Sequence, residues 1–149
     1  GPQGLHDLTP GDGGSLRVTG GDPFVIYDVS AHAIAPAQAG LLKFDFTCTR
    51  PPPGPKPVPA IPRLQVFYWG GAVGGPAESA SLYFNAADGT MIVPLDAYPR
   101  YLDLGTLAGV RIDLDTVDAC AAITVRNVGL YQRHSVLDYA HAAQRPRGP

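Results

Sequence analysis

Short β-type segments alternate with glycine- and proline-rich turns along the whole chain. The 18 glycines and 16 prolines exceed a fifth of the 149 residues, which disfavours a helical bundle. The segments recur at roughly 8–12-residue intervals without helical patterns between them. The expected strands are Leu16–Val18, Phe24–Asp28, Leu41–Thr49, Leu64–Trp69, Ala80–Asn85, Thr90–Leu95, Tyr101–Leu104, Gly109–Leu114 and Ala122–Tyr131. The pattern predicts an all-β fold, an antiparallel two-sheet β-sandwich.

The length fits a single domain. We expect the sandwich to occupy residues 16–133. Residues 1–15 are rich in glycine and aspartate and are expected to be frayed, beginning with a Gly-Pro pair that resembles the scar of a cleaved tag. Residues 134–149 are expected to form a short C-terminal helix or a linker toward a missing region. The chain is therefore expected to be one domain of a longer protein.

Two local patterns refine the strand map. In Ala122–Tyr131 the apolar parity slips by one residue, which predicts a β-bulge near Arg126 and Asn127. The segment Pro51–Pro62 lacks hydrogen-bond donors and predicts a polyproline-type loop between two strands. A stiff surface connection is favoured over a ligand for an SH3-like module.

Two cysteines permit one disulfide. Cys48 continues the inward side of its strand, whereas Cys120, counted in phase with Ile123 and Val125, falls on the opposite side. This parity favours buried free thiols and leaves a Cys48–Cys120 bridge as the alternative.

Charge and hydropathy exclude some partners. The net charge is −2 and the eleven basic residues are dispersed, so neither nucleic acid nor an anionic membrane surface is an expected partner. No apolar run approaches the ~18 residues that a membrane helix needs, so this segment is not expected to insert into a membrane.

No motif indicates a catalytic centre. The nucleophile-elbow pattern G-x-S-x-G is absent, the four histidines lack zinc-ligand spacing, and the glycines around Gly70 are not followed by the Lys-Ser/Thr of a phosphate-binding loop. A glycosidase would need two facing acids, one of them desolvated, which the sequence cannot show. The chain is therefore expected not to be an enzyme.

Three carboxylates offer the one candidate metal site. Asp113, Asp115 and Asp118 follow one another near a strand end, a pattern that can coordinate calcium in β-sandwiches. Pairing of Arg111 with Asp113 is the favoured alternative. No cofactor is otherwise expected.

The second face of the predicted sheet is the candidate binding surface. Leu64, Val66 and Tyr68 alternate with residues that mix aromatic rings and amides, as do Leu82 and Phe84. The candidate ligand-binding residues are Trp69, Phe67, Tyr83, Gln65 and Asn85, with Lys43 and Asp45 from a neighbouring strand. Such rings and hydrogen-bonding groups suit a carbohydrate.

Two alternatives to this surface stay open. The Phe67 and Trp69 rings could instead pack under the proline-rich loop, under the terminal segment or against a missing domain. A site could also be built from edge loops that carry Asp96, Tyr98 and Tyr101.

The order of segments resembles that of the small β-sandwich domains, of the galactose-binding or carbohydrate-binding-module type, that accompany bacterial glycosyltransferases and polysaccharide-assembly proteins. The segments that carry the likeness are DPFVIYDV (22–29), LQVFYWG (64–70), ESASLYF (78–84), VPL (93–95), VRIDLD (110–115) and ITVRNVGLY (123–131). The resemblance implies a jelly-roll-like sandwich with no chemistry of its own. Leu114, where a proline would often follow the strand aspartate, and the long Pro51–Pro62 insertion depart from the usual pattern.

The leading hypothesis is a non-catalytic carbohydrate-binding module, an accessory domain of a bacterial envelope-polysaccharide glycosyltransferase. Its expected partners are an oligo- or polysaccharide and the remainder of the parent chain. The resemblance suggests a location at the cytoplasmic membrane or in the periplasm. The alternative is a structural or protein-interaction domain that packs on the catalytic domain or mediates oligomerisation.

Overall fold

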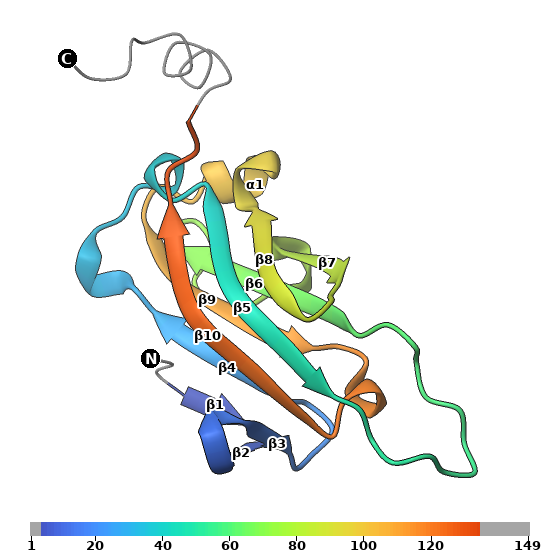
Figure 1. Ribbon diagram of the computed structural model, residues 1–149. Helices are drawn as coiled ribbons and strands as arrows, with labels where there is room; N and C mark the ends of the chain where they lie inside the picture. Colours follow the sequence, from blue (N-terminus) through green and yellow to red (C-terminus); the bar gives the residue numbers. More distant parts are fainter. Residues whose placement is uncertain (1–3, 135–149) are drawn as a thin grey trace, which may run out of the picture.

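The computed structural model describes residues 4–134, which form two antiparallel sheets of five strands each. Sheet A has the order β1-β4-β9-β6-β7 and sheet B the order β2-β3-β10-β5-β8. The strands are β1 (Gly4–His6), β2 (Leu8–Pro10), β3 (Leu16–Val18), β4 (Phe24–Asp28), β5 (Leu41–Thr49), β6 (Arg63–Gly70), β7 (Ser81–Asn85), β8 (Gly89–Pro94), β9 (Leu107–Leu114) and β10 (Ala122–Tyr131). The sheets lie face to face (Figure 1), so the predicted all-β sandwich is confirmed.

Short helical turns lie between the strands. They are η1 (Asp12–Gly14), η2 (Ser30–His32), η3 (Pro36–Gln38), η4 (Glu78–Ala80), η5 (Leu95–Ala97), α1 (Pro99–Leu102) and η6 (Val117–Ala119). Within residues 4–134, no helix is long and apolar enough to span a bilayer.

The strand order is that of a jelly roll. The eight strands from β3 to β10 are divided between the two sheets in the orders β3-β10-β5-β8 and β4-β9-β6-β7. These are the orders that the two Greek keys of a jelly roll produce. Strands β1 and β2 each extend one sheet by one strand at the same edge. The topology therefore agrees with the jelly-roll expectation.

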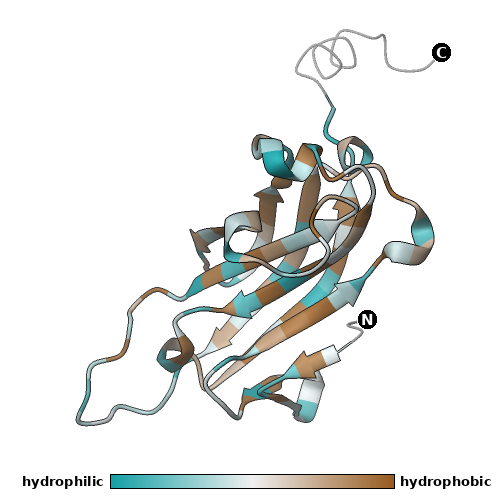
Figure 2. Ribbon diagram, turned by 180° about the vertical axis from the view of Figure 1, so that it is seen from behind, coloured by the Kyte–Doolittle hydropathy of each residue, from teal (hydrophilic) through white to brown (hydrophobic). Residues whose placement is uncertain are grey.

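Period-two alternation creates the core. Leu64, Val66 and Tyr68 on β6 face inward, opposite Phe44 and Phe46 of sheet B, and all five are buried. Hydrophobic and hydrophilic residues accordingly alternate along the strands (Figure 2). The parity assigned from the sequence to β6 is confirmed.

Part of the predicted frayed N-terminus is ordered instead. Residues 4–10 form β1 and β2, with β1 paired to β4 and β2 paired to β3. Asp7 lies between them with φ 52° and accepts a hydrogen bond from the Asp22 amide. Pairing with β3, the next strand, and with β4 orders this polar segment, so its composition was a misleading guide. The proposed tag scar and the terminal helix lie outside the described residues.

The predicted strand Tyr101–Leu104 is wrong. Residues 99–102 form the one-turn helix α1, which has Pro99 at its first turn, a position where the fixed φ of proline is favourable. Tyr101 is fully buried, and its hydroxyl donates a 2.6 Å hydrogen bond to the Ala39 carbonyl. Burial of this aromatic side chain therefore comes from a helical turn packed on the sandwich.

The predicted bulge and loop are confirmed. The register of β10 against β5 shifts between Arg126 and Gly129, and Asn127 adopts φ 54°, as expected of a β-bulge. Residues 51–62 connect β5 to β6 without regular secondary structure and extend away from the sheets (Figure 1).

A disulfide joins Cys48 to Cys120, contrary to the favoured free thiols. The parity count assumed that Cys120 belongs to the last strand, but β10 begins at Ala122, and Cys120 lies in the connection after η6. Outside a strand, side chains do not alternate between faces, so the Cys120 side chain is able to turn toward Cys48. The two Cα atoms are 5.5 Å apart, a typical separation for a bridge.

Candidate functional site

The outer face of sheet A brings together polar and aromatic side chains from four strands. In the pairing register, Phe24 on β4 faces Asp113 on β9, Asp113 faces Gln65 on β6, and Gln65 faces Tyr83 on β7. Paired residues of antiparallel strands point to the same side of a sheet. These four side chains therefore form a continuous row across sheet A.

A cavity of about 330 Å³ opens beside this row, and we call it the outer cleft. It is lined by Gly21, Asp22, Gln65, Phe67, Glu78, Tyr83, Arg111, Asp113, Leu114, Asp115 and Val117. Its volume lies at the lower end of the range found for small-molecule sites. Three of the predicted residues, Gln65, Phe67 and Tyr83, contribute to its walls.

Arg111 occupies the centre of the outer cleft. Its guanidinium lies between the rings of Phe24 and Phe67, 4.1 and 4.2 Å from their centroids. It also donates two hydrogen bonds of 2.8 Å to the carboxylate of Asp113, so the predicted Arg111–Asp113 pair is confirmed. Burial raises the pKa of Asp113 above its ordinary value, and Arg111 offsets part of that rise.

The Arg111 contact decides the role of Phe67. The Phe67 side chain is only 4% exposed, because the guanidinium covers the ring face that would otherwise reach solvent. Phe67 therefore supports Arg111 through a cation–π contact and offers no free face for stacking on a sugar. The sequence predicted Phe67 among the rings available to a sugar, and its burial under Arg111 contradicts that role.

A second hydrogen-bond network forms the other wall. The Gln65 amide Nε2 donates to Glu78 Oε2 and to Ser81 Oγ, both at 2.9 Å. The Tyr83 hydroxyl donates to the same Glu78 oxygen at 3.1 Å. Desolvation, followed by the hydrogen bond to Glu78, raises the pKa of Tyr83 above its ordinary value. Glu78 therefore fixes both neighbouring side chains, and sequence reasoning missed it.

Several acceptor atoms on these walls remain available. Among residues 4–134, no hydrogen bond is made to Gln65 Oε1, to Glu78 Oε1 or to the carboxylate of Asp22. Tyr83 is 46% exposed, with the guanidinium of Arg63 4.8 Å from its ring centroid. Arg63 is in turn held by Asp115. The outer cleft can therefore accept hydrogen bonds from a ligand beside one accessible aromatic ring.

Two other predicted residues of sheet A lie away from the cleft. Trp69 is half-buried and covers Gly109, its partner on β9, where a Cβ would collide with the indole. Asn85 is exposed at the far end of β7, opposite Arg63. Neither residue lines the outer cleft.

Lys43 and Asp45 lie on the opposite side of the molecule, so the expectation that they stand beside Gln65 is wrong. Both are on the outer face of β5, which belongs to sheet B. Lys43 Nζ is 5.9 Å from the ring centroid of Tyr131. Asp45 accepts 2.8 Å hydrogen bonds from Asn127 Nδ2 and Thr90 Oγ1, which lower its pKa below the ordinary value. The jelly-roll crossover places β5 and β6 in different sheets.

The candidate calcium ligands do not converge. Asp113 is bound by Arg111 and Asp115 by Arg63, whereas Asp118 is exposed on η6. No group of three histidine, cysteine, aspartate or glutamate side chains suited to a metal ion occurs in the part of the chain that the structure describes. Arg63 and Arg111, both on strands of sheet A, neutralise the carboxylates that a calcium ion would otherwise bind.

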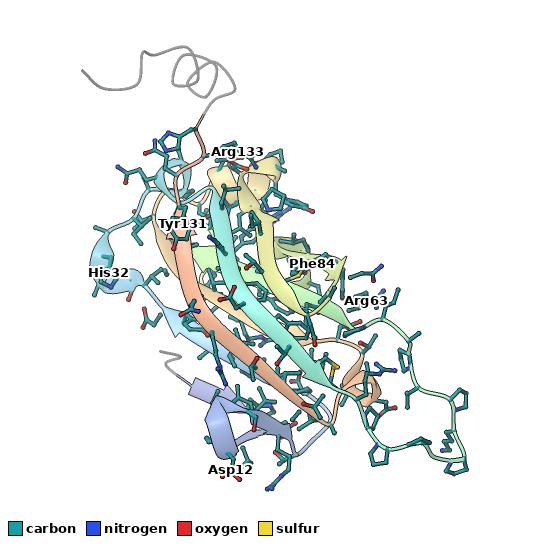
Figure 3. The ribbon with its side chains drawn as sticks, in the orientation of Figure 1. Asp12, His32, Arg63, Phe84, Tyr131 and Arg133 are labelled. Carbon is teal, nitrogen blue, oxygen red and sulfur yellow. A yellow bond between two sulfur atoms is a disulfide. The ribbon has the colours of Figure 1, made fainter. Side chains whose placement is uncertain are left out.

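The alternative edge-loop site is not formed either. Tyr101 is a core residue, and both oxygens of Asp96 accept hydrogen bonds from Arg133 at 2.7 and 2.8 Å. Figure 3 shows Arg133 just beyond the end of β10. These contacts tie the C-terminal end of β10 to η5.

Comparison with known proteins adds no relative. No protein-family model, curated protein or solved structure matches the chain significantly. These comparisons therefore assign no family to the chain, and the functional argument rests on the fold and the outer cleft.

Proposed function

We propose that this domain is a non-catalytic carbohydrate-binding module that contacts its glycan in the outer cleft. The observation that carries the proposal is a cavity of about 330 Å³ whose walls present unused acceptors beside the exposed ring of Tyr83. Sugar hydroxyls are hydrogen-bond donors, and the apolar C–H face of a pyranose suits a flat aromatic ring. Gln65 and Tyr83 are on paired strands, and both donate hydrogen bonds to Glu78, so little ordering of these groups is needed on binding.

The charge of the cleft favours an uncharged glycan. Four carboxylates line it against the single guanidinium of Arg111, and this cation is already paired. A uronic acid would meet like charge there, which disfavours binding. We therefore expect neutral or amino sugars to bind, and the resemblance in segment order suggests an envelope polysaccharide handled by a parent glycosyltransferase.

The test is calorimetric titration with neutral and uronic-acid oligosaccharides prepared from the host's own polysaccharide. Asp22→Ala removes a carboxylate that hydrogen-bonds to no described side chain, so it should spare the fold and weaken binding by about tenfold. Tyr83→Ala should weaken binding by a similar factor through loss of ring contact.

Two further variants distinguish this cleft from the surface predicted from the sequence. Trp69→Ala and Lys43→Ala lie outside the outer cleft and should leave the affinity unchanged. Full affinity in Asp22→Ala and Tyr83→Ala, with loss in Trp69→Ala, would transfer the site to the indole. Absence of binding to every glycan would reject the proposal.

The protein-interaction alternative rests on the outer face of sheet B. Ile92 is 59% and Tyr131 51% exposed, and both lie beside Lys43. Exposed apolar side chains grouped on one face mark interaction surfaces. This candidate predicts a dimer at high concentration that Ile92→Ser dissociates, as measured by light scattering.

A further inference from the structure

A second cavity lies between the sheets rather than on either outer face. It has a volume of about 320 Å³ and opens between the end of β4 and the end of β10. We call it the intersheet cleft. Figure 3 shows His32 on the loop that flanks this opening and Tyr131 at the end of β10. The walls are mostly apolar and include Val29, Ile34 and Leu130.

The intersheet cleft is open because strand pairing ends there. Within residues 4–134, β3 pairs with β10 only at Ala122 and Ile123, and β1 pairs with β4 only as far as Ile26. Beyond these points no further strand covers the gap between the sheets. The inward-facing side chains of Tyr27 and Val128 consequently remain only partly buried.

The cleft reaches the core. Its lining includes Leu42 and Val110, which are 0% and 2% exposed. It is therefore a true opening between the two layers. Its volume is about twice the roughly 150 Å³ of an engineered apolar cavity that holds benzene, which gives room for about ten to twelve non-hydrogen atoms.

Two hydrogen-bonding side chains lie among the apolar walls. Tyr27 is partly buried, and its hydroxyl makes no hydrogen bond within residues 4–134. Desolvation raises the pKa of Tyr27 to about 12, so the hydroxyl stays protonated and can donate. The imidazole of His32, on η2, forms part of the lining and is exposed.

We propose that the intersheet cleft binds a medium-chain carboxylate, with the alkyl chain between the sheets and the carboxylate at the Tyr27 hydroxyl and the His32 imidazole. The apolar walls remove the chain from water. The two donors suit an acceptor head group, and no carboxylate side chain lines this cleft to oppose it. The site is separate from the outer cleft and does not depend on carbohydrate binding.

The experiment titrates octanoate, which has ten non-hydrogen atoms, into the 149-residue chain. We expect saturable binding at one site with a Kd of roughly 0.01–1 mM. Amide shifts in a ¹⁵N NMR titration should be confined to the ends of β4 and β10, to residues 29–34 and to the neighbourhoods of Leu42 and Val110, which also line the cleft. Absence of saturation, or shifts centred on the outer cleft, would overturn the proposal. This titration uses the wild-type protein, so it does not depend on whether a variant folds.

Variants test the two parts of the ligand separately. Val128→Trp should fill the cleft and weaken binding by at least about tenfold. Tyr27→Phe keeps the shape of the cleft and should weaken octanoate binding by about three- to tenfold through loss of one hydrogen bond. Octanol should bind the wild type and Tyr27→Phe more nearly equally. Ile92→Ser, on the outer face of sheet B, is the control and should bind like the wild type. Unchanged affinity in Val128→Trp or in Tyr27→Phe would contradict the assigned pose.

Discussion

The two ends of strand β10 differ in how firmly they are held. At its beginning, β10 pairs with β3 and β5, and Cys120 just before it is bonded to Cys48. At its end, past the bulge at Asn127, it pairs with β5 alone and borders the intersheet cleft. One strand therefore has a closed end that secures the fold and an open end that leaves part of the core accessible.

Side-chain contacts reinforce this difference. At the closed end, Arg50 donates hydrogen bonds to the Ala119 and Pro59 carbonyls, which connects the proline-rich loop to the region of the disulfide. At the open end, Arg133 just beyond β10 is held by Asp96, but no disulfide anchors the strand there, and its Leu130 is only partly buried against the core. Local stability within one domain commonly varies in this way, and binding surfaces tend to lie at the less stable end.

Removing the disulfide is expected to have the largest effect on the closed end. The bridge spans 72 residues, so chain entropy predicts that Cys48→Ala with Cys120→Ala lowers the free energy of unfolding by about 4 kcal/mol. Urea unfolding followed by the fluorescence of the single tryptophan measures this. Thr49→Ala, exposed next to Cys48, is the control. A loss below about 1 kcal/mol would mean that pairing alone secures the closed end.

Truncating one apolar side chain in each half of β10 tests whether its two ends are packed differently. Ile123 is 3% exposed, so Ile123→Ala should cost about 3 kcal/mol through transfer and cavity terms. Leu130→Ala should cost only about 1 kcal/mol because this side chain is already partly in contact with water. The two values come from urea unfolding under one set of conditions. Equal losses would show that the open end is packed as tightly as the closed one.

The bulge that separates the two halves gives a smaller effect. Asn127 has φ 54° and donates a hydrogen bond to Asp45. Asn127→Ala should cost about 1–2 kcal/mol from the left-handed backbone and the lost bond. Asn127→Gly should cost less, since glycine adopts this φ without strain. A larger loss for glycine than for alanine in thermal unfolding would contradict the backbone explanation.

The smallest effect is a titration. The pKa of Asp45 is lowered by Asn127 and Thr90, whereas that of Asp113 is raised by burial. The stabilisation from Asp45 is present above the ordinary pKa and is lost as pH falls through the folded pKa. That from Asp113 is present below the ordinary value and is lost as pH rises through its folded pKa. Carboxyl ¹³C NMR of Asn127→Ala should show the Asp45 pKa rising and that of Asp113 unchanged; movement of both would mean a wider rearrangement.

Local periodicity predicted much of the fold. Patterns within about ten residues of sequence predicted the core strands, the inward orientation of Leu64 and Val66, and the bulge near Asn127. Where a helical turn or a loop replaced the strand period, as at Tyr101 and Cys120, parity assigned the wrong surroundings. The N-terminal strands depend on pairing with β3 and β4, which composition alone does not reveal.

The candidate site was harder to predict because its geometry is long-range. Gln65 and Tyr83 were identified since they pair across neighbouring strands. That Arg111 would cover Phe67 requires knowing that β9 lies between β4 and β6. Glu78 comes from η4, in a connection with no periodic pattern. The only available signal for it was its position just before a strand that carries outward polar groups.

The strand order also sets when the molecule can fold. Strands β9 and β10, the last two that the structure describes, are each third of five in their sheets. Until residues 107–131 have left the ribosome, each sheet lacks its middle strand, and only edge pairs such as β6 with β7 are able to form. Assembly of the sandwich must therefore wait until both strands have been synthesised, and the long-range pairing makes it slow. A chain that stops before β9 would expose two unfilled sheets, with the aggregation hazard of unpaired strands.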